Sequence, residues 1–309
     1  MISKLSHKII HFWQLLQHDR RFVTAVPFGW LGLFFLVPFL IIIKISFSQT
    51  RIAIPPFQPL WQWAKDGQLR IQIYFQAYAK LFTDPFYVEA LLNSLLLAAI
   101  ATLICLGVGY MMAYAISRAQ PRWRTILMLL IILPFWTSYL IRVYAWIGLL
   151  NTQGIFNKIL LTFGWIDAPL LLIYNSFSVT LGLVYCYLPF MILPIYATLL
   201  KINPVYLEAA YDLGCRPWRA FWTLTVPLSM PGIIAGCILV FIPTVGEYVI
   251  PELLGGSKSL MLGRVIWMEF FNNRDWPMAC ALTVVMLTIF VIPVIMIQRA
   301  QLPNEEYHS

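Results

Sequence analysis

Residues 208–227 read Glu-Ala-Ala-Tyr-Asp-Leu-Gly-Cys-Arg-Pro-Trp-Arg-Ala-Phe-Trp-Thr-Leu-Thr-Val-Pro, and they form a polar interruption in an otherwise apolar chain. The stretch begins with good helix formers, which predict a short helix ending near Leu213. Gly214 then permits a turn of the backbone, Pro217 starts a second short helix, and Pro227 ends it. The pattern predicts a helix–turn–helix elbow in the cytosol, with a small flat surface that a partner could approach.

The composition on either side of this elbow is typical of a membrane protein. Charged residues make up 11% of the chain and hydrophobic residues 61%, whereas a soluble protein carries roughly a quarter charged residues. The net charge of +8 does not indicate nucleic-acid binding, because the basic residues are not clustered on a basic domain. They fit instead the excess of Lys and Arg on the cytosolic side of membrane proteins. We therefore expect the chain to contact a lipid bilayer and no nucleic acid.

The five cysteines and four histidines do not form a recognisable site. No C-x-x-C pair is present, and four cysteines fall in apolar runs, so we interpret them as small buried hydrophobic residues. His7 and His11 lie one helical turn apart, but no further metal ligands accompany them. A nucleophile elbow, a phosphate loop and a dinucleotide fingerprint are also missing from the sequence. We expect no catalytic residue, no metal and no cofactor, so energy for any process that the chain drives would come from another subunit or an ion gradient.

Six apolar segments are long enough to cross roughly 30 Å of hydrocarbon as helices. They cover about 27–47, 90–117, 125–150, 176–200, 232–254 and 277–297. We therefore predict an all-α integral membrane protein with six transmembrane helices. Its parts are a cytosolic N-terminal segment over 1–26 that can form an interfacial helix, a transmembrane domain over 27–298 that includes the elbow loop at 201–231, and a cytosolic tail over 299–309.

The loop between the second and third spans gives the strongest single indication of orientation. Arg118, Arg122 and Arg124 crowd this short loop, which places it on the cytosolic side. Six spans with both termini in the cytosol put the elbow on the same side. The long connections at about 48–89 and 151–175 then lie outside, and we expect the second of them to carry a short interfacial helix.

Two ionisable residues fall inside the predicted spans, where a charge costs at least about 2.5–3.5 kcal/mol. Arg142 and Glu247 each lie about 16 residues into an outward-running span, so we expect both in the outer half of the bilayer. In one interpretation they form a structural ion pair. In the other, Glu247 faces a central pathway and contacts a cationic substrate. Pro243 and Gly246 favour the second interpretation, because broken helices commonly line transport pathways, but the sequence leaves both open.

Aromatic and acidic residues at similar depth, or near the outer mouth, complete the predicted pathway. An ammonium group over an aromatic face gains about 0.5–2 kcal/mol, so rings and carboxylates together suit an organic polycation. Each ring taken alone is also explained by core packing or by the aromatic belt at the membrane surface. The predicted pathway residues are Glu247, Tyr248, Trp136, Tyr144, Glu252 and Asp275.

The spacing of the elbow resembles that of a known family. Residues 208–210 (Glu-Ala-Ala), Gly214 three residues later, and 224–227 (Leu-Thr-Val-Pro) nine residues further on are similar to the EAA loop of permease subunits of binding-protein-dependent ABC importers. Leu and Val at 224 and 226 replace the Ile and Leu of that motif and keep its apolar character. In the family, this loop docks into a groove on the cytosolic ATPase. The resemblance implies that role for Glu208, Ala209, Ala210, Asp212, Gly214 and Pro227.

Four further segments, at 132–138, 141–146, 245–256 and 270–277, look like the polyamine branch of this family. The resemblance is closest to permeases for putrescine, with spermidine/putrescine permeases next. It implies polyamine transport across the bacterial inner membrane. The implied partners are a second, different permease subunit, a dimer of ATP-binding subunits and a periplasmic substrate-binding protein.

Other functions remain as alternatives. Related permeases carry other ions or organic solutes, so the substrate is less well determined than the family. A secondary transporter driven by an ion gradient would be expected to show inverted repeats, and the spacing of the elbow argues against it. The sequence does not decide between putrescine and spermidine, or between a homodimer and a heterodimer.

Overall fold

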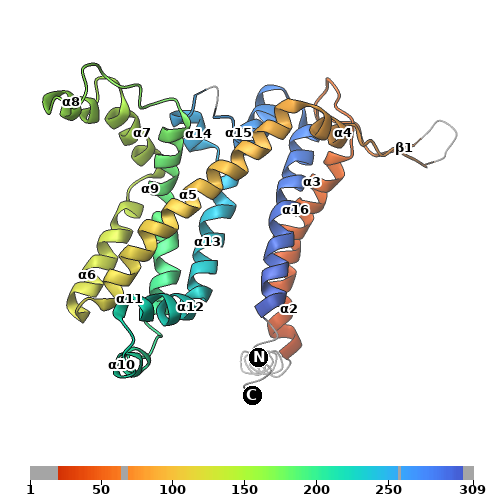
Figure 1. The fold of residues 1–309 in the computed structure, drawn as a ribbon. Helices are drawn as coiled ribbons and strands as arrows, with labels where there is room; N and C mark the ends of the chain where they lie inside the picture. The colour runs from red at the N-terminus through yellow and green to blue at the C-terminus, as the bar shows by residue number, and fades with distance from the viewer. Residues whose placement is uncertain (1–19, 64–68, 257–258, 302–309) are drawn as a thin grey trace, which may run out of the picture. The chain divides into compact units, whose positions relative to one another are not determined.

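The computed structural model describes residues 20–63, 69–256 and 259–301 (Figure 1). Of the N-terminal segment expected over 1–26, residues 1–19 lie outside the described residues, and residues 20–26 form the start of an apolar helix. The predicted tail after residue 301 also lies outside the described residues. The chain divides into two compact units. One holds the residues up to Lys80 together with those from Asn273 onward, and the other holds Leu81–Asn272.

The first unit is built on two apolar helices. The first consists of α2 (Arg20–Leu31), a π-helical turn η1 (Gly32–Leu36) and α3 (Val37–Ser46) in continuous succession. Helix α3 packs against α16 (Trp276–Gln301). The connection after α3 contains a small antiparallel hairpin of β1 (Trp61–Trp63) and β2 (Leu69–Ile71), which is the one departure from a helical fold among the described residues. The predicted all-α architecture is otherwise confirmed.

The second unit has a core of three long helices, α5 (Pro85–Arg118), α9 (Ser176–Leu199) and α13 (Met230–Val245), which pack pairwise on one another. Helix α5 begins sharply because the Asp84 carboxylate accepts a hydrogen bond from the Phe86 amide at 3.0 Å. Asn175 and Ser178 form a reciprocal capping box at the start of α9. Helix α9 then runs unbroken through Pro189 and Pro194.

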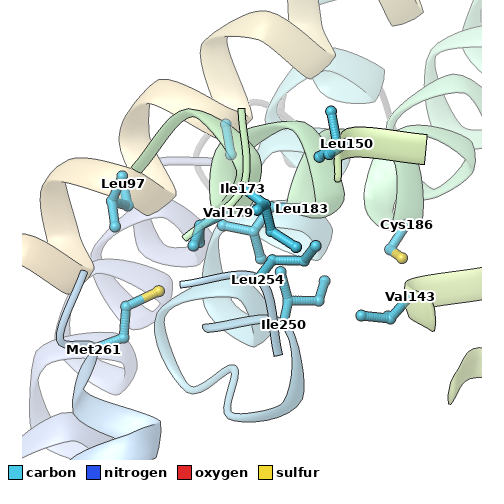
Figure 2. Close-up of a cluster of buried hydrophobic side chains, with 11 residues drawn as sticks. Leu97, Val143, Leu150, Ile173, Val179, Leu183, Cys186, Ile250, Leu254 and Met261 are labelled. Atoms are coloured by element: carbon cyan, nitrogen blue, oxygen red, sulfur yellow. The ribbon is translucent and has the colours of Figure 1, made fainter. Parts of the chain in front are cut away.

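Shorter elements close both ends of this three-helix core (Figure 1). A buried apolar cluster joins α5, α9, α7 and α14 at one end, as Figure 2 shows for Leu97, Val143, Leu183, Ile250 and Leu254. The remaining elements are α4 (Gln76–Thr83), α6 (Pro121–Ile132), η2 (Leu133–Trp136), α7 (Tyr139–Leu150), α8 (Ile155–Thr162), α10 (Val205–Asp212), α11 (Pro217–Ala220), η3 (Phe221–Thr225), α12 (Val226–Leu228), α14 (Val249–Leu254), α15 (Leu262–Trp267) and η4 (Met268–Asn272).

The third predicted span is not the straight helix that the sequence suggested, whereas the fifth is broken next to Gly246, as Pro243 and Gly246 indicated. The third bends by 91° between Trp136 and Tyr139, because the turn η2 ends in extended backbone at Thr137. The fifth ends at Val245, and a separate helix, α14, begins at Val249. Apolar composition alone does not reveal such breaks, because both arms of each break are apolar.

Three described helices are long and apolar enough to cross a membrane, and the number rises to five if each bent pair counts as one span. The three are Thr24–Ser46, Pro85–Arg118 and Ser176–Leu199. Trp276–Ile292, within α16, is a shorter apolar helix. The count of six spans therefore stays a prediction.

Candidate functional site

The elbow has the two-helix form that its sequence predicts. Helix α10 ends at Asp212, and Gly214 adopts the left-handed conformation (φ 78°), which a side chain disfavours. The Gly214 and Cys215 amides donate to the carbonyls of Tyr211 and Ala210, both at 2.9 Å, and this closes the helix end. One detail differs. Pro227 does not end the second helix, because the π-helical turn η3 before it shifts the hydrogen-bond pattern and the helix continues to Leu228.

Aromatic contacts tie the elbow to the end of α5. Tyr114 packs edge-on against Phe221 with ring centroids 5.3 Å apart, and the hydroxyls of Tyr110 and Ser229 are 3.0 Å apart. Leu207 is buried on the inner side of α10. These contacts fix the elbow to the end of the core where α5 finishes and α6 begins (Figure 1). The sequence predicted that the elbow and the arginine-rich loop between α5 and α6 lie on the same side of the membrane.

The outer side of the elbow is open and carries large apolar side chains. Leu213 is 88% exposed and Trp218 is 72% exposed. Glu208, Ala209 and Asp212 are exposed on α10. An exposed patch of this kind, rimmed by polar groups, marks an interaction surface.

The second candidate site is the helix break at Glu247, just after the end of α13 and beside the middle of α9. Both carboxylate oxygens of Glu247 are used. Oε2 accepts the hydroxyl hydrogen of Tyr187 at 2.5 Å, and Oε1 accepts the amide of Val249 at 3.0 Å, which caps α14. Glu247 is half-buried. The break is held tightly, because Gly263 approaches the carbonyls of Gly246 and Glu247 so closely that a side chain would collide with them.

A row of aromatic rings leads away from Tyr187, the residue that bonds to this carboxylate. The Tyr187 ring lies 6.1 Å from the Phe190 ring, which in turn lies 5.3 Å from the Phe135 ring. The Tyr139 hydroxyl is buried, and it lies close enough to Glu247 for the two groups to interact electrostatically. It forms no well-aligned hydrogen bond with any described atom. A half-buried carboxylate among rings is an arrangement suited to an organic cation.

Arg142 lies beside the same rings and does not pair with Glu247. Its guanidinium carbon is 4.8 Å from the Phe135 ring centroid and 5.6 Å from that of Tyr139. No ion pair within 4 Å joins Arg142 to Glu247 in the part of the chain that the structure describes. The Arg142 Nε is buried and finds no hydrogen-bond partner among the described residues. The predicted ion pair is therefore absent from this conformation, and the guanidinium rests on aromatic faces instead.

The other predicted pathway residues do not gather around Glu247. Trp136 and Tyr144 are 78% and 58% exposed, and Tyr248 stacks on Trp267 with centroids 4.5 Å apart. Glu252 forms a 2.6 Å ion pair with Arg264.

Asp275 belongs to the other unit. Its Oδ1 accepts the Thr50 hydroxyl at 2.6 Å and the Met278 amide at 3.1 Å, so it caps the start of α16. Both hydrogen bonds give Asp275 a structural role at the start of α16.

The sequence did not single out Tyr187 as a pathway residue. Tyr187 lies 60 residues from Glu247 along the chain, and only the packing of α9 beside the break brings the two together. The only sequence feature that could have drawn attention to Tyr187 is its position two residues before a proline in an apolar span.

Comparison with known proteins identifies the family of the chain. Residues 106–301 match the family described as "Binding-protein-dependent transport system inner membrane component". The spermidine/putrescine transport system permease protein PotB of Escherichia coli (strain K12) is 39% identical over 280 residues, covering 90% of this chain and 95% of that protein. PotB of Haemophilus influenzae is 37% identical over 283 residues, covering 91% and 93%.

A solved structure shows the same fold. One chain of a bacterial ABC transporter that imports the acidic polysaccharide alginate superposes with a TM-score of 0.65 at 17% identity, covering 94% of this chain and 99% of that one. This similarity shows the fold alone. The match over residues 106–301 and the identity along nine tenths of the chain show that the protein belongs to the family of inner membrane components of binding-protein-dependent transport systems.

Proposed function

We propose that this chain is the membrane-spanning permease subunit of an ABC importer for polyamines, with putrescine first and spermidine next. The relatives named above support the substrate class, since both carry spermidine/putrescine in their names. The single observation that carries the proposal is the half-buried Glu247 carboxylate at a helix break, bonded to Tyr187 and bordered by aromatic rings.

The chemistry of this site suits a substrate with separated ammonium groups. A carboxylate supplies the charge that a desolvated ammonium needs, and ring faces add about 0.5–2 kcal/mol each. The position of Arg142 over Phe135 and Tyr139 supports this, because these rings already hold a cation of the chain itself. In our proposal, a substrate ammonium contacts Glu247 and the ring of Tyr187 beside it during its passage.

The remaining parts of the proposal concern topology and partners. The chain crosses the inner membrane six times within 27–298, with both termini and the elbow in the cytosol. Helix α16 supplies the sixth span, since its 26 residues extend about 39 Å at 1.5 Å per residue. The exposed outer side of the elbow docks on a dimer of ATP-binding subunits. A second permease subunit completes the pathway, and a periplasmic binding protein delivers the substrate.

The Glu247→Gln variant tests the substrate role, because glutamine keeps the shape and still caps α14 but removes the charge. We expect uptake of labelled putrescine and spermidine into proteoliposomes holding the full transporter to fall at least about tenfold, the effect of losing one charge-assisted hydrogen bond. Assembly should be unchanged. Glu89→Gln is the matched control and should transport normally, because Glu89 is exposed on α5 and belongs to neither candidate site.

A structural role for Glu247 with Arg142 predicts a different result. Glu247→Gln would then assemble poorly, and neutralising Arg142 in the same protein would restore both assembly and uptake. Full recovery of transport in that double variant would rule out the substrate role. The same proteoliposomes, tested with unrelated solutes, separate polyamine transport from transport of another ion.

A further inference from the structure

A cavity of about 290 Å³ lies behind the elbow and is not part of either site described above. Its walls come from the end of α5, the start of α6, the end of α9 and the elbow itself. Polar side chains from three of these segments line it: Ser117 and Arg118 of α5, Arg124 of α6 and Thr225 of η3. Leu207 of α10 closes the side toward the elbow. The cavity is therefore built where the arginine-rich loop meets the elbow.

Two polar atoms that line this cavity have unmet hydrogen-bonding capacity. Thr225 is only 3% exposed, and no described atom forms a hydrogen bond with its Oγ1. The Nε of Arg124 is also buried, and the described residues offer it no acceptor. Buried polar groups in folded proteins almost always have a partner. A hydroxyl and a guanidinium N–H left without partners in one cavity indicate a missing ligand that accepts hydrogen bonds.

The charge of the cavity indicates the chemistry of that ligand. The Nη2 of Arg124 donates to the Ser117 carbonyl at 2.8 Å and to the Ala119 carbonyl at 3.3 Å, so the guanidinium is held in place at the end of α5. Arg118 lies over the Tyr114 ring at 5.1 Å. None of the described residues that line the cavity is acidic. Two guanidinium groups beside hydroxyls form a typical site for a phosphate oxyanion.

We propose that this cavity binds a phosphate-class oxyanion, supplied either as the phosphodiester of an anionic phospholipid or as free inorganic phosphate. The bound anion bridges Arg124 and Thr225 and so fixes the elbow to the ends of α5 and α6. The proposal does not depend on which solute is transported. It gives the arginine-rich loop a binding function in addition to its effect on membrane orientation.

The test measures the thermal stability of the purified full-length chain under two pairs of conditions. The first pair compares inorganic phosphate with chloride at equal ionic strength in detergent. The second compares nanodiscs containing phosphatidylglycerol with nanodiscs of phosphatidylcholine alone. We expect the unfolding midpoint to rise in at least one pair. A rise with phosphate identifies a free anion, and a rise only with phosphatidylglycerol identifies a lipid headgroup.

Three variants make the result specific to the cavity. Thr225→Val keeps the shape of the side chain and removes only an unpaired hydroxyl, so its baseline stability should match or exceed that of the wild type. Its apparent affinity for the anion should fall at least about tenfold. Arg118→Gln should lower the apparent affinity for the anion to a similar extent. Arg122→Gln is the control, because this arginine lies in the same loop but does not line the cavity; its response should equal that of the wild type.

The outcomes that overturn the proposal are equally defined. One is an absence of any rise in either pair of conditions. Another is an equal loss of the response in Arg122→Gln and Thr225→Val, which would assign the effect to surface charge in general. A rise that appears only after a purified ATP-binding subunit is added would assign the cavity to an acidic side chain of that partner instead.

Discussion

Replacing Gly263 with alanine should displace the helix break that carries Glu247. A Cβ at this position would lie 2.6 Å from the carbonyl oxygen of Glu247 and would collide with that of Gly246 as well. Both obstacles are backbone atoms, so the clash cannot be relieved by rotating a side chain. Forcing an extra carbon into a packed site costs about 1–3 kcal/mol.

Gly107→Ala is the matched control for this change. It also lies in a helix, and its added Cβ would meet nothing within 4 Å. Both substitutions gain up to about 1 kcal/mol of helix propensity, so comparing them cancels that gain and leaves the clash. We expect Gly263→Ala to be less stable than Gly107→Ala by about 1–3 kcal/mol.

The assay is the free energy of unfolding of the two purified proteins, together with polyamine uptake by the reconstituted transporter. Gly263→Ala should lose stability and uptake, because the carboxylate moves away from Tyr187, whereas Gly107→Ala should keep both. Equal stability and equal uptake in the two variants would show that the break tolerates displacement, and the reasoning about its tight packing would be wrong.

Three further predictions concern the elbow, the topology and the carboxylate. Gly214→Val should uncouple ATP hydrolysis from uptake while the membrane part stays folded, since φ of 78° costs a side chain about 1–2 kcal/mol; unchanged uptake would count against the coupling role. Single cysteines in a background without native cysteines should react with an impermeant reagent added outside at Thr152 but not at Gln120, and the reverse pattern would invert the topology. Tyr187→Phe should lower uptake at least about tenfold by removing the 2.5 Å bond to the carboxylate, whereas Tyr185→Phe, which changes a tyrosine two residues away, should leave uptake normal.

The elbow could be predicted from the sequence because its form depends on local chain chemistry. Gly214 alone supplies the left-handed turn, and Pro217 begins the second helix wherever the rest of the chain lies. The apolar spans were predicted for a similar reason, since hydrophobic length is a property of a single segment. The 91° bend after Trp136 could not be predicted, because its position depends on how the two arms pack on their neighbours.

The sequence singled out Glu247 but not the side chain that bonds to it. Glu247 stood out because a carboxylate in an apolar span is costly wherever it lies. Its aromatic neighbours could not be chosen in the same way, since an apolar span contains many rings and helical depth does not show which way each one faces. Trp136 and Tyr144 were therefore named from depth alone and stay predictions, and the contact between Tyr187 and Glu247 became visible only in the structure.

The helices before and after the elbow are joined to each other over much of their length. Helix α9 enters the elbow and α13 leaves it. An added Cβ on Gly232 would lie 2.6 Å from the Pro194 carbonyl oxygen, and one on Gly236 would lie 2.8 Å from the Met191 Sδ. Glycines that permit such close approach let two helix backbones pack as one body in a membrane.

This pairing provides a physical route from the elbow to the carboxylate. Tyr187 lies midway along α9, and Glu247 comes two residues after the last residue of α13. The 2.5 Å hydrogen bond therefore joins the middle of α9 to the end of α13 that is farther from the elbow. The 16 residues of α13 cover about 24 Å at 1.5 Å per residue. A partner that moves the elbow moves both helices together, because the glycine contacts prevent them from sliding independently. We therefore expect the helix break, which lies beyond the last of these contacts, to be the place where such a movement changes the surroundings of the carboxylate.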